Sequence, residues 1–505
     1  MTRGHAVGID FGTTNSVVAH GTVATAGVLS GTSEGPLLPS VVSLTDDGAL
    51  VGREATERAV ERPAETVAGI KRHLGEEHTG VTAPDGTEYT PEQVAALVFS
   101  RLRGRAEAAL DGPVADAVVT VPAYFGHRQR TAVRRAAEIA GLDVRRLLSE
   151  PTAACLAYGV GAADGSGAEL VLVYDLGGGT FDVSLVDVSD GVYDVLASKG
   201  DTRLGGNDWD DHIIEWYRSQ LDSSATETPG TSARLRKLAK QARHDLTEQE
   251  STTVELPALG MNDAVEATLT RETLDDLTGD LVDRTLDICD DVLASAGRNP
   301  WSIDRLLLVG GATRMPQIRE AVYDFFGDVP SEDVDPDQVV ATGAAIQASI
   351  IHDGPETSDG SDAVMVDVAP RPLGVETMVD GEAGYFSPVI EAQTSIPASR
   401  TRHYRTVRDD QRSVSVRVYS GEAERVADNE YLGSFVLRGL PRAPAGEVGV
   451  DVTFTVTENG LLEVEAAENE TGRAVDVTIE SPFDGPDGEV RKAREQLPTL
   501  EHADA

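Results

Sequence analysis

The sequence predicts an α/β domain followed by an antiparallel β domain, and three observations lead to this fold class. Within residues 1–352, short apolar runs alternate with helical patterns, which is typical of α/β architecture. The runs at 117–121, 170–175 and 305–311 are rich in valine and leucine, which indicates strands covered on both faces. After residue 368, apolar residues recur at every second position, as in antiparallel strands with one buried face.

The valine-rich runs of the first part are each followed by glycine, proline or aspartate. Ligands of open α/β sheets bind just beyond the strand ends, so polar chemistry is expected at these points. A chain of 505 residues is long enough for about three domains with separate cores.

An acidic segment separates the two domains. Residues 353–363, DGPETSDGSDA, hold too little apolar surface to pack, so they predict a linker. The linker runs on into the short apolar stretch AVMVD at 363–367, which a flexible spacer would not need. We therefore assign the whole interdomain linker to residues 353–367.

The β domain is expected over residues 368–480. Valines alternate with polar residues in its strands, and Asn459 with Gly460 provides a hairpin turn between two of them. The tail, 481–505, contains one expected helix, GEVRKAREQL, which Pro498 stops.

The chain is strongly acidic, with 85 Asp and Glu against 43 Lys and Arg and a net charge of -42. Only five of the basic residues are lysine. This composition indicates adaptation to a concentrated-salt cytoplasm. At 1 M salt the Debye length is about 3 Å, so the repulsion among the acidic side chains is screened. An unusually acidic protein that works at ordinary salt is the alternative. Binding to nucleic acid or anionic membranes through general electrostatics is not expected.

Cysteine content and the first residues bear on the compartment. Two cysteines, Cys155 and Cys289, cannot build a disulfide framework, which favours a reducing environment. The start, MTRGHAVGID, lacks the apolar region of a signal peptide, and no stretch approaches a membrane span. We expect a cytoplasmic protein.

Two segments of the first domain resemble each other. IDFGTTNSVVAH at 9–20 and YDLGGGTFDVSLV at 174–186 both place an aspartate at a strand end, then a Gly/Thr turn, then a second strand. Such a turn exposes backbone N–H groups to an anion, and glycine allows a phosphate to approach closely. The two copies therefore predict two halves of one phosphate site, which a third segment, VGGATRMP at 309–316, would extend.

With VTVPAYFGHRQR at 119–130, SEPTAACLAYG at 149–159 and GDTRLGGNDWD at 200–210, these segments resemble the heat-shock protein 70 (DnaK) chaperone family. The resemblance runs in order over residues 5–480. It implies an actin-like ATPase domain of two lobes and a β-sandwich that binds extended peptides. The helical lid that follows in this family is expected to be nearly absent. ATP or ADP, Mg²⁺ and K⁺ are the implied cofactors.

The resemblance assigns catalytic roles position by position. Asp10 and Asp175 match carboxylates that hold Mg²⁺ largely through water, and the alternative is that they cap the two turns. Lys71 matches the lysine that positions the attacking water, and the alternative is an ordinary surface lysine. Glu150 and Asp182 match carboxylates that orient water and metal, with an exposed helix cap as the alternative for Glu150. The implied catalytic set is Lys71, Asp10, Glu150, Asp175, Thr180 and Asp182.

The nucleotide is expected to contact the glycine turns and one helix. In ARLRKLAKQARHDLT the stripe Leu235, Leu238, Ala242 and Leu246 should be buried, leaving Lys240, Arg243, His244 and Thr247 on a polar face. Lys240 stands where the family has glutamate and His244 where it has arginine, and a solvated basic stripe is the alternative. The implied nucleotide-binding residues are Gly12, Thr13, Thr14, Gly177, Gly178, Gly179, Thr180, Gly205, Gly206, Arg243, Thr247, Gly310, Gly311, Arg314 and Asp337.

Communication between domains and peptide binding are also implied. The coupling residues are Pro122, Arg130, Val364, Met365, Val366 and Asp367, although Pro122 could be an ordinary strand terminator. The groove residues are Val375, Thr377, Met378, Tyr404, Val407, Val414 and Val416, any of which could instead be core. Arg146 matches a position that docks J-domain co-chaperones, but Ser149 replaces the usual asparagine. Unfolded polypeptides, a J-domain partner and a nucleotide exchange factor are the expected partners.

Three functions remain open at this level. The first is a chaperone that hydrolyses ATP to control peptide binding and release. The second is a scaffold or exchange-factor-like relative that holds ATP with little turnover. The third, a small-molecule kinase of the same fold class, gives no reason for a peptide-binding β domain, although fold alone does not exclude it.

Overall fold

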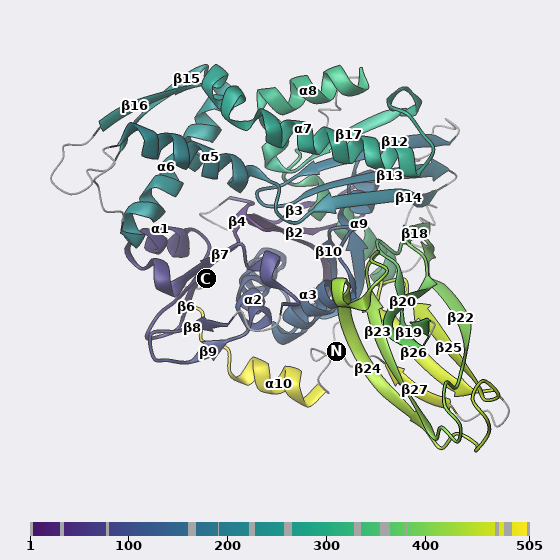
Figure 1. Cartoon of the computed structure of the whole chain (residues 1–505). Coiled ribbons are helices and arrows are strands. Elements are labelled where there is room, and N and C mark those ends of the chain that lie inside the picture. Colours follow the sequence, from purple (N-terminus) through teal and green to yellow (C-terminus); the bar gives the residue numbers. More distant parts are fainter. Residues whose placement is uncertain are drawn as a thin grey trace.

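The computed structural model has an α/β body in two lobes with a β-sandwich beside it (Figure 1). It describes residues 4–30, 35–76, 80–159, 168–189, 191–221, 228–256, 265–327, 335–353, 364–379, 381–469, 474–478 and 487–501. Most of the expected linker, residues 354–363, therefore lies outside the described residues. In the described part of the chain, no helix combines the length and the apolarity needed to cross a bilayer.

The first lobe is built on a sheet with the strand order β11-β10-β1-β2-β3, to which β4 adds beside β2. Helices cover both faces, because Val7 and Ile9 pack under α2 and α3 while Ala6 and Gly8 pack under α4 and α9. This two-sided burial explains the continuous apolar runs. The bounds are β1 His5–Phe11, β2 Asn15–His20, β3 Gly27–Val28, β4 Leu38–Pro39, β10 Val114–Val121, β11 Asp143–Ser149, α2 Pro91–Leu110, α3 His127–Ile139, α4 Glu150–Ala157 and α9 Val339–Asp353.

Smaller elements complete this lobe. Three short strands form the sheet β6-β5-β7, and the 3₁₀ helix η2 follows β7 and carries Lys71. Their bounds are β5 Val41–Leu44, β6 Ala49–Val51, β7 Thr66–Ala68, β8 Val81–Thr82, β9 Glu88–Tyr89, α1 Arg53–Glu61, η1 Pro63–Glu65 and η2 Ile70–His73.

The second lobe repeats the plan with the strand order β17-β12-β13-β14-β18-β21. Strand β12 pairs antiparallel with β13 and parallel with β17, so the second glycine turn and the third glycine segment follow neighbouring strands. The bounds are β12 Glu169–Leu176, β13 Phe181–Ser189, β14 Val192–Asp201, β15 Ser251–Leu256, β16 Val265–Thr270, β17 Arg305–Val309, β18 Val364–Val368, β21 Ser395–Ile396, α5 Gly206–Gln220, α6 Pro229–Glu248, α7 Arg271–Ser295, α8 Pro316–Phe326, η3 Pro300–Ser302 and η4 Gly311–Arg314.

The apolar end of the expected linker forms strand β18. It pairs parallel with β14 of the second lobe, with Tyr193 opposite Met365, and antiparallel with β21 of the C-terminal domain. Met365 and Val368 are buried in the core of the α/β body. Strand pairing and burial therefore account for an apolar run that a spacer would not need.

The C-terminal domain is a sandwich of two four-stranded antiparallel sheets, β20-β19-β23-β24 and β22-β25-β26-β27. Along β25, Val450, Val452, Phe454 and Val456 are buried while the residues between them are partly exposed, so the period-two pattern is confirmed. The bounds are β19 Leu373–Val379, β20 Glu382–Ile390, β22 Ala398–Arg405, β23 Ser413–Ser420, β24 Glu430–Arg438, β25 Gly449–Val456, β26 Leu462–Glu468, β27 Ala474–Thr478 and η5 Val426–Asp428.

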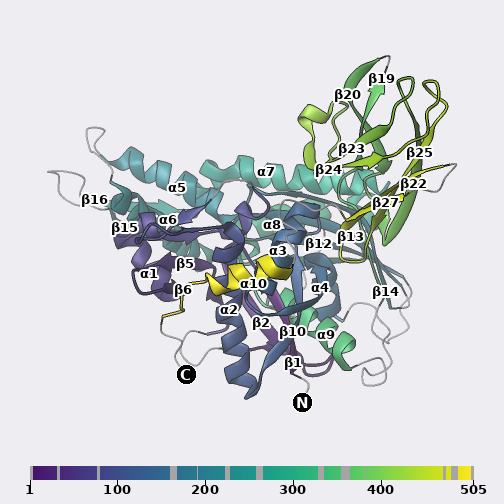
Figure 2. The ribbon, with the colours of Figure 1, turned by 90° about the horizontal axis from the view of Figure 1, so that it is seen from below.

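The tail returns to the first lobe. Helix α10, Asp487–Glu495, lies beside α3 rather than against the sandwich (Figure 2). Arg494 Nε donates to the carbonyl of Ile139 at 3.0 Å, at the end of α3. Further on, the backbone of Ala49 exchanges hydrogen bonds with Thr499 (2.9 Å) and Glu501 (3.0 Å). The C-terminal segment thus ties the sandwich to the first lobe, while β18 ties it to the second.

Candidate functional site

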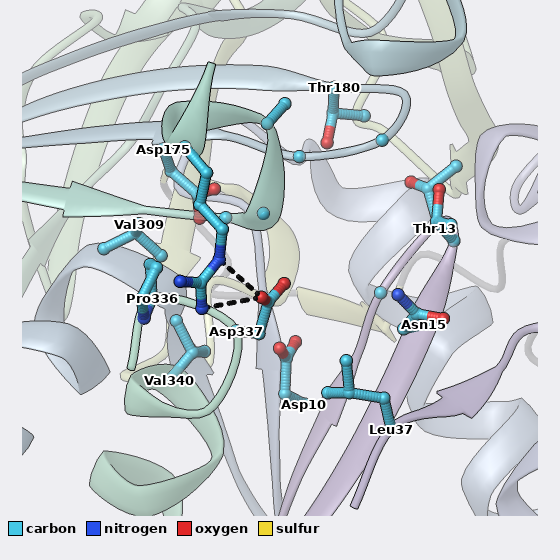
Figure 3. A pocket seen from close by; sticks show the side chains of 18 of the residues that line it. Asp10, Thr13, Asn15, Leu37, Asp175, Thr180, Val309, Pro336, Asp337 and Val340 are labelled. Carbon is cyan, nitrogen blue, oxygen red and sulfur yellow. Dashed lines mark hydrogen bonds and ion pairs between the residues drawn. The ribbon is translucent and has the colours of Figure 1, made fainter. Parts of the chain in front are cut away.

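A cavity of about 430 Å³ lies between the two lobes (Figure 3). The β1–β2 turn and η2 line it from the first lobe, and the β12–β13 turn, α6 and η4 line it from the second. It therefore opens beyond the strand ends where the sequence predicts polar chemistry. The predicted residues that line it are Asp10, Gly12, Thr13, Thr14, Lys71, Glu150, Asp175, Gly177, Gly178, Thr180, Arg243, Thr247, Gly310, Gly311, Arg314 and Asp337.

The two glycine turns meet across this cavity. A β-carbon added at Gly178 would lie 1.8 Å from Thr14 Oγ1, so only glycine allows the tips to come this close. Arg72 also bridges the lobes, since its Nε donates to the carbonyl of Gly179 at 2.9 Å. Thr13 Oγ1 is buried and has no hydrogen-bond partner among the described residues. The paired turns form a concave surface with an unused hydroxyl, which suits an anionic ligand.

Four charged side chains gather at this end of the cavity. Lys71 Nζ lies 2.7 Å from Glu150 Oε1, and the two side chains are only 3% and 9% exposed. Burial, with the charge of Glu150 adding to it, raises the pKa of Asp10 to about 7, against the opposing effect of Lys71. The pKa of Asp175 is likewise raised well above its usual range by burial and by the neighbouring carboxylates. One ammonium thus faces the buried carboxylate of Glu150 and two half-buried ones, Asp10 and Asp175.

This donor set fits a hydrated divalent cation. Excess buried negative charge is relieved by a cation, and carboxylate oxygens suit Mg²⁺, which keeps much of its own water. Thr120 Oγ1 donates to Asp10 Oδ1 at 3.1 Å and so holds that carboxylate in place. Within the described ranges no group of three or more His, Cys, Asp or Glu is arranged to hold a metal ion.

Four residues assigned to the site lie outside the cavity lining: Gly179, Asp182, Gly205 and Gly206. Asp182, on β13, accepts hydrogen bonds from the backbone N–H of Ala123 at 3.1 Å and from Ser198 Oγ at 3.4 Å. Burial raises the pKa of Asp182 to about 8. The structure therefore places this carboxylate behind the β12–β13 turn, at the loop that follows β10, rather than in the cavity.

Helix α6 differs in part from its expected pattern. Leu235, Ala242 and Leu246 are buried, but Ala239 takes the buried place that was expected for Leu238. Arg243 is not on a solvated face. It is 7% exposed, and its Nε donates to Asp210 Oδ1 at 2.7 Å. A partner 33 positions away decides this burial, and the spacing within the helix does not reveal it.

A second arginine of the cavity lining, Arg314, is also paired. Arg314, in η4, bonds to Asp337 at 3.1 Å and also forms an ion pair with Asp335. Thr247 Oγ1 donates to the carbonyl of Arg243 at 3.2 Å. These groups add polar lining to the cavity from α6 and η4.

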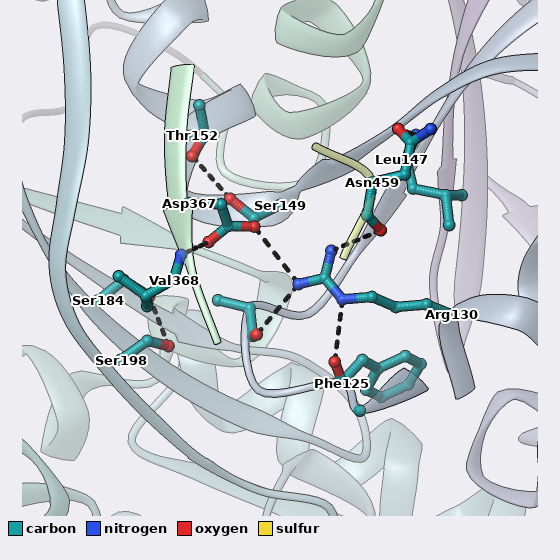
Figure 4. Close-up of polar contacts among 12 residues, drawn as sticks. Phe125, Arg130, Leu147, Ser149, Thr152, Ser184, Ser198, Asp367, Val368 and Asn459 are labelled. Atoms are coloured by element: carbon teal, nitrogen blue, oxygen red, sulfur yellow. Dashed lines mark hydrogen bonds and ion pairs between the residues drawn. The ribbon is translucent and has the colours of Figure 1, made fainter. Parts of the chain in front are cut away.

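Arg130 links the α/β body, the linker and the sandwich (Figure 4). Its side chain is 1% exposed; Nη2 lies 3.3 Å from Asp367 Oδ2, and Nε donates to the carbonyl of Phe125 at 2.9 Å. Nη1 reaches the carbonyl of Asn459 at 3.5 Å. Pro122 ends the strand before this loop, and its carbonyl accepts from the N–H of Phe125 at 3.1 Å. Arg130 thus joins the loop that follows β10 to β18 and to the sandwich.

Sequence reasoning missed several residues at this junction. His127 Nδ1 accepts from the N–H of Leu462 at 2.9 Å, and Asn459 Oδ1 accepts from the N–H of Leu147 at 3.1 Å. Gln393 Oε1 accepts from the N–H of Ser198 at 3.2 Å. No local pattern marks these residues, because each partner lies more than 190 positions away. At Asn459 the sequence indicates only a hairpin turn.

The expected groove residues divide into two groups. Val375 and Val416 lie in the sandwich core, and Val414 and Tyr404 pack against it. Met378 and Val407 are 40% and 51% exposed, and Thr377 is half-buried. The alternative of a core position therefore holds for Val375 and Val416, whereas Met378 and Val407 are accessible from outside the sandwich.

A two-lobed α/β body with a cavity between its lobes, joined to a β-sandwich, is the architecture that the Hsp70 resemblance implies. A model of the Hsp70 family, described as Hsp70 protein, matches residues 6–505. Two relatives, both named Chaperone protein DnaK and from two strains of Halobacterium salinarum, are 40% identical over 482 residues. Each alignment covers 94% of this chain and 75% of the relative. The chain belongs to the Hsp70 family.

Proposed function

We propose that this Hsp70 chain is an ATP-dependent chaperone that hydrolyses ATP, and that its nucleotide state sets the affinity of the sandwich for extended apolar peptide segments. The facing glycine turns with the buried Lys71–Glu150 pair beside them carry this proposal. Phosphoryl transfer to water depends mostly on positioning and electrostatics, and this cavity offers both.

Each charged group has a role in the proposal. The turns at Gly12 and Gly178 cradle the phosphates, and Asp10 with Asp175 would hold hydrated Mg²⁺. Mg²⁺ supplies charge neutralisation on the phosphate oxygens when bound. Lys71 faces the γ-phosphate and its water, and the ion pair with Glu150 fixes its ammonium in place. K⁺ completes the proposed cofactors.

Coupling would run through β18. Asp367 sits at the pairing of β18 with β21 and is bound to Arg130 of the α/β body. A change in the lobes alters the edge of β14, and the sandwich is attached there. J-domain and exchange-factor partners belong to the proposal; Arg146, on β11, is the candidate contact for the former. The proposed setting is the cytoplasm, in concentrated salt, with no nucleic-acid or membrane partner.

ATP turnover in molar salt, with and without an unfolded polypeptide, tests this function. We expect Mg²⁺-dependent hydrolysis that the polypeptide stimulates and that Lys71→Ala abolishes. Lys237→Ala is the matched control, because Lys237 is an exposed lysine of α6 outside the cavity lining. Equally slow hydrolysis in all three proteins would favour an ATP-holding scaffold and refute the enzyme.

A further inference from the structure

One cation at the α6 end of the cavity has no partner among the described residues. Arg243 is bound to Asp210, and Arg314 is bound to Asp335 and Asp337. Lys240 also lines the cavity, but no hydrogen bond or ion pair joins it to another side chain in the part of the chain that the structure describes. Unlike the two arginines, Lys240 therefore has no carboxylate bonded to it among the described residues.

The surroundings of Lys240 offer it little compensation. Burial and the neighbouring charge of Arg243 lower its pKa, and the carboxylate of Asp210, which is bound to Arg243, offsets this only in part. The pKa of His244, the next cavity residue, is lowered to about 4 by burial and by these two cations, so this imidazole is neutral at pH 7. The only other carboxylate that α6 brings to the cavity, Glu248, lies eight positions along the helix, about 12 Å away at 1.5 Å per residue. A half-buried ammonium without a counter-ion is costly, so a bound anion would stabilise it.

The scarcity of lysine in the chain also draws attention to Lys240. The chain has five lysines, and two of them line this one cavity: Lys71 from η2 of the first lobe and Lys240 from α6 of the second. An ammonium has three rotatable donors on a compact charge, which suits phosphate oxygens where a planar guanidinium fork does not fit. The glycine turns take the triphosphate, so the sugar of a bound nucleotide faces α6 and Lys240.

We infer that the cavity prefers nucleotides that carry a phosphate on the ribose, at the 2′ or 3′ oxygen, and that Lys240 is the residue that selects them. This inference rests on the proposed function of the same cavity as a nucleotide site. A carboxylate near the sugar would accept hydrogen bonds from ribose hydroxyls, whereas a basic residue there accommodates a phosphate, as in dinucleotide-binding folds. The ribose phosphate supplies the missing counter-ion of Lys240.

Calorimetric titration of the full chain at constant ionic strength tests this inference. The probes are ADP, its 2′-phosphate derivative and its 3′-phosphate derivative, each with Mg²⁺. We expect at least one derivative to bind about tenfold more tightly than ADP, as a charge-assisted hydrogen bond predicts. Lys240→Glu should reverse this preference and Lys240→Gln should remove it. Lys237→Glu, on the exposed side of the same helix, should keep it.

Two results would overturn the inference while leaving the proposed function intact: ADP binding at least as tightly as both derivatives, or an unchanged preference in Lys240→Glu. Failure of all three probes to bind would instead refute the nucleotide site itself, and the inference with it. Correct folding of each variant is checked by its melting temperature without ligand.

Discussion

Lowering the pH from 7.5 to 5 is expected to loosen the contact between the sandwich and the α/β body, through one histidine. His127 is 6% exposed, and its Nδ1 accepts a hydrogen bond from the N–H of Leu462 across the junction. Burial, followed by the charge of Arg128, lowers the pKa of His127 from 6.5 to about 4. Protonation of Nδ1 would set two N–H groups against each other, so the charged form is incompatible with this contact.

The direction and the size of this pH effect follow from the linkage between protonation of His127 and docking of the sandwich. With the domains apart, we expect His127 to be exposed and to titrate near 6.5, whereas in the contact its pKa is about 4. The separated state therefore takes up a proton as the pH falls below 6.5, and the contact loses stability between that value and about pH 4. At pH 5 the docking equilibrium should be about 30-fold weaker than at pH 7.5, or about 2 kcal/mol.

Hydrogen exchange of the Leu462 amide and of the β18 amides, corrected for the intrinsic effect of pH, measures this loosening. His127→Gln is the matched variant, because an amide oxygen accepts from the same N–H without titrating. Faster exchange at pH 5 in the wild type, but not in His127→Gln, is the expected result. Equal acid sensitivity in both proteins would refute the assignment to His127.

Three further outcomes are expected. Lys71→Ala should lower ATP turnover at least 100-fold. Without nucleotide it should also lower the free energy of unfolding by about 3 kcal/mol, because Glu150 loses its buried partner. Turnover assays measure the first effect and urea titration the second, and wild-type values in both would contradict the proposed role of Lys71. Gly178→Ala should weaken ATP binding more than tenfold, since the added β-carbon would lie 1.8 Å from Thr14 Oγ1. Calorimetry measures the affinity, and an unchanged value would contradict the close approach of the two turns. Arg494→Ala should free α10 from the first lobe and speed hydrogen exchange along that helix, whereas unchanged exchange would refute its role as a tie.

The parts of the fold that could be predicted from the sequence are those with a local cause. Continuous valine runs predict strands covered on both faces, and alternation predicts the sandwich, because burial imposes these patterns on each strand separately. The glycine turns were recognisable for the same reason: the close approach at Gly178 needs glycine, whatever the rest of the chain does.

Pairings between distant residues could not be predicted in this way. Arg243 is buried because Asp210 lies across from it, and Asp182 faces the loop after β10 rather than the cavity. His127 meets Leu462, 335 positions further on. Only the packing of whole domains brings such groups together, and neither residue type nor spacing along the chain carries that information.

The rate at which a labelled apolar peptide leaves the sandwich, measured in molar salt with and without ATP and Mg²⁺, tests most directly whether the cleft controls the binding domain. ATP binding between the lobes should speed release at least several-fold in the wild type and have a smaller effect in Asp367→Asn, whose ion pair with Arg130 is lost. A rate that ATP leaves unchanged would contradict the proposed coupling between the two domains.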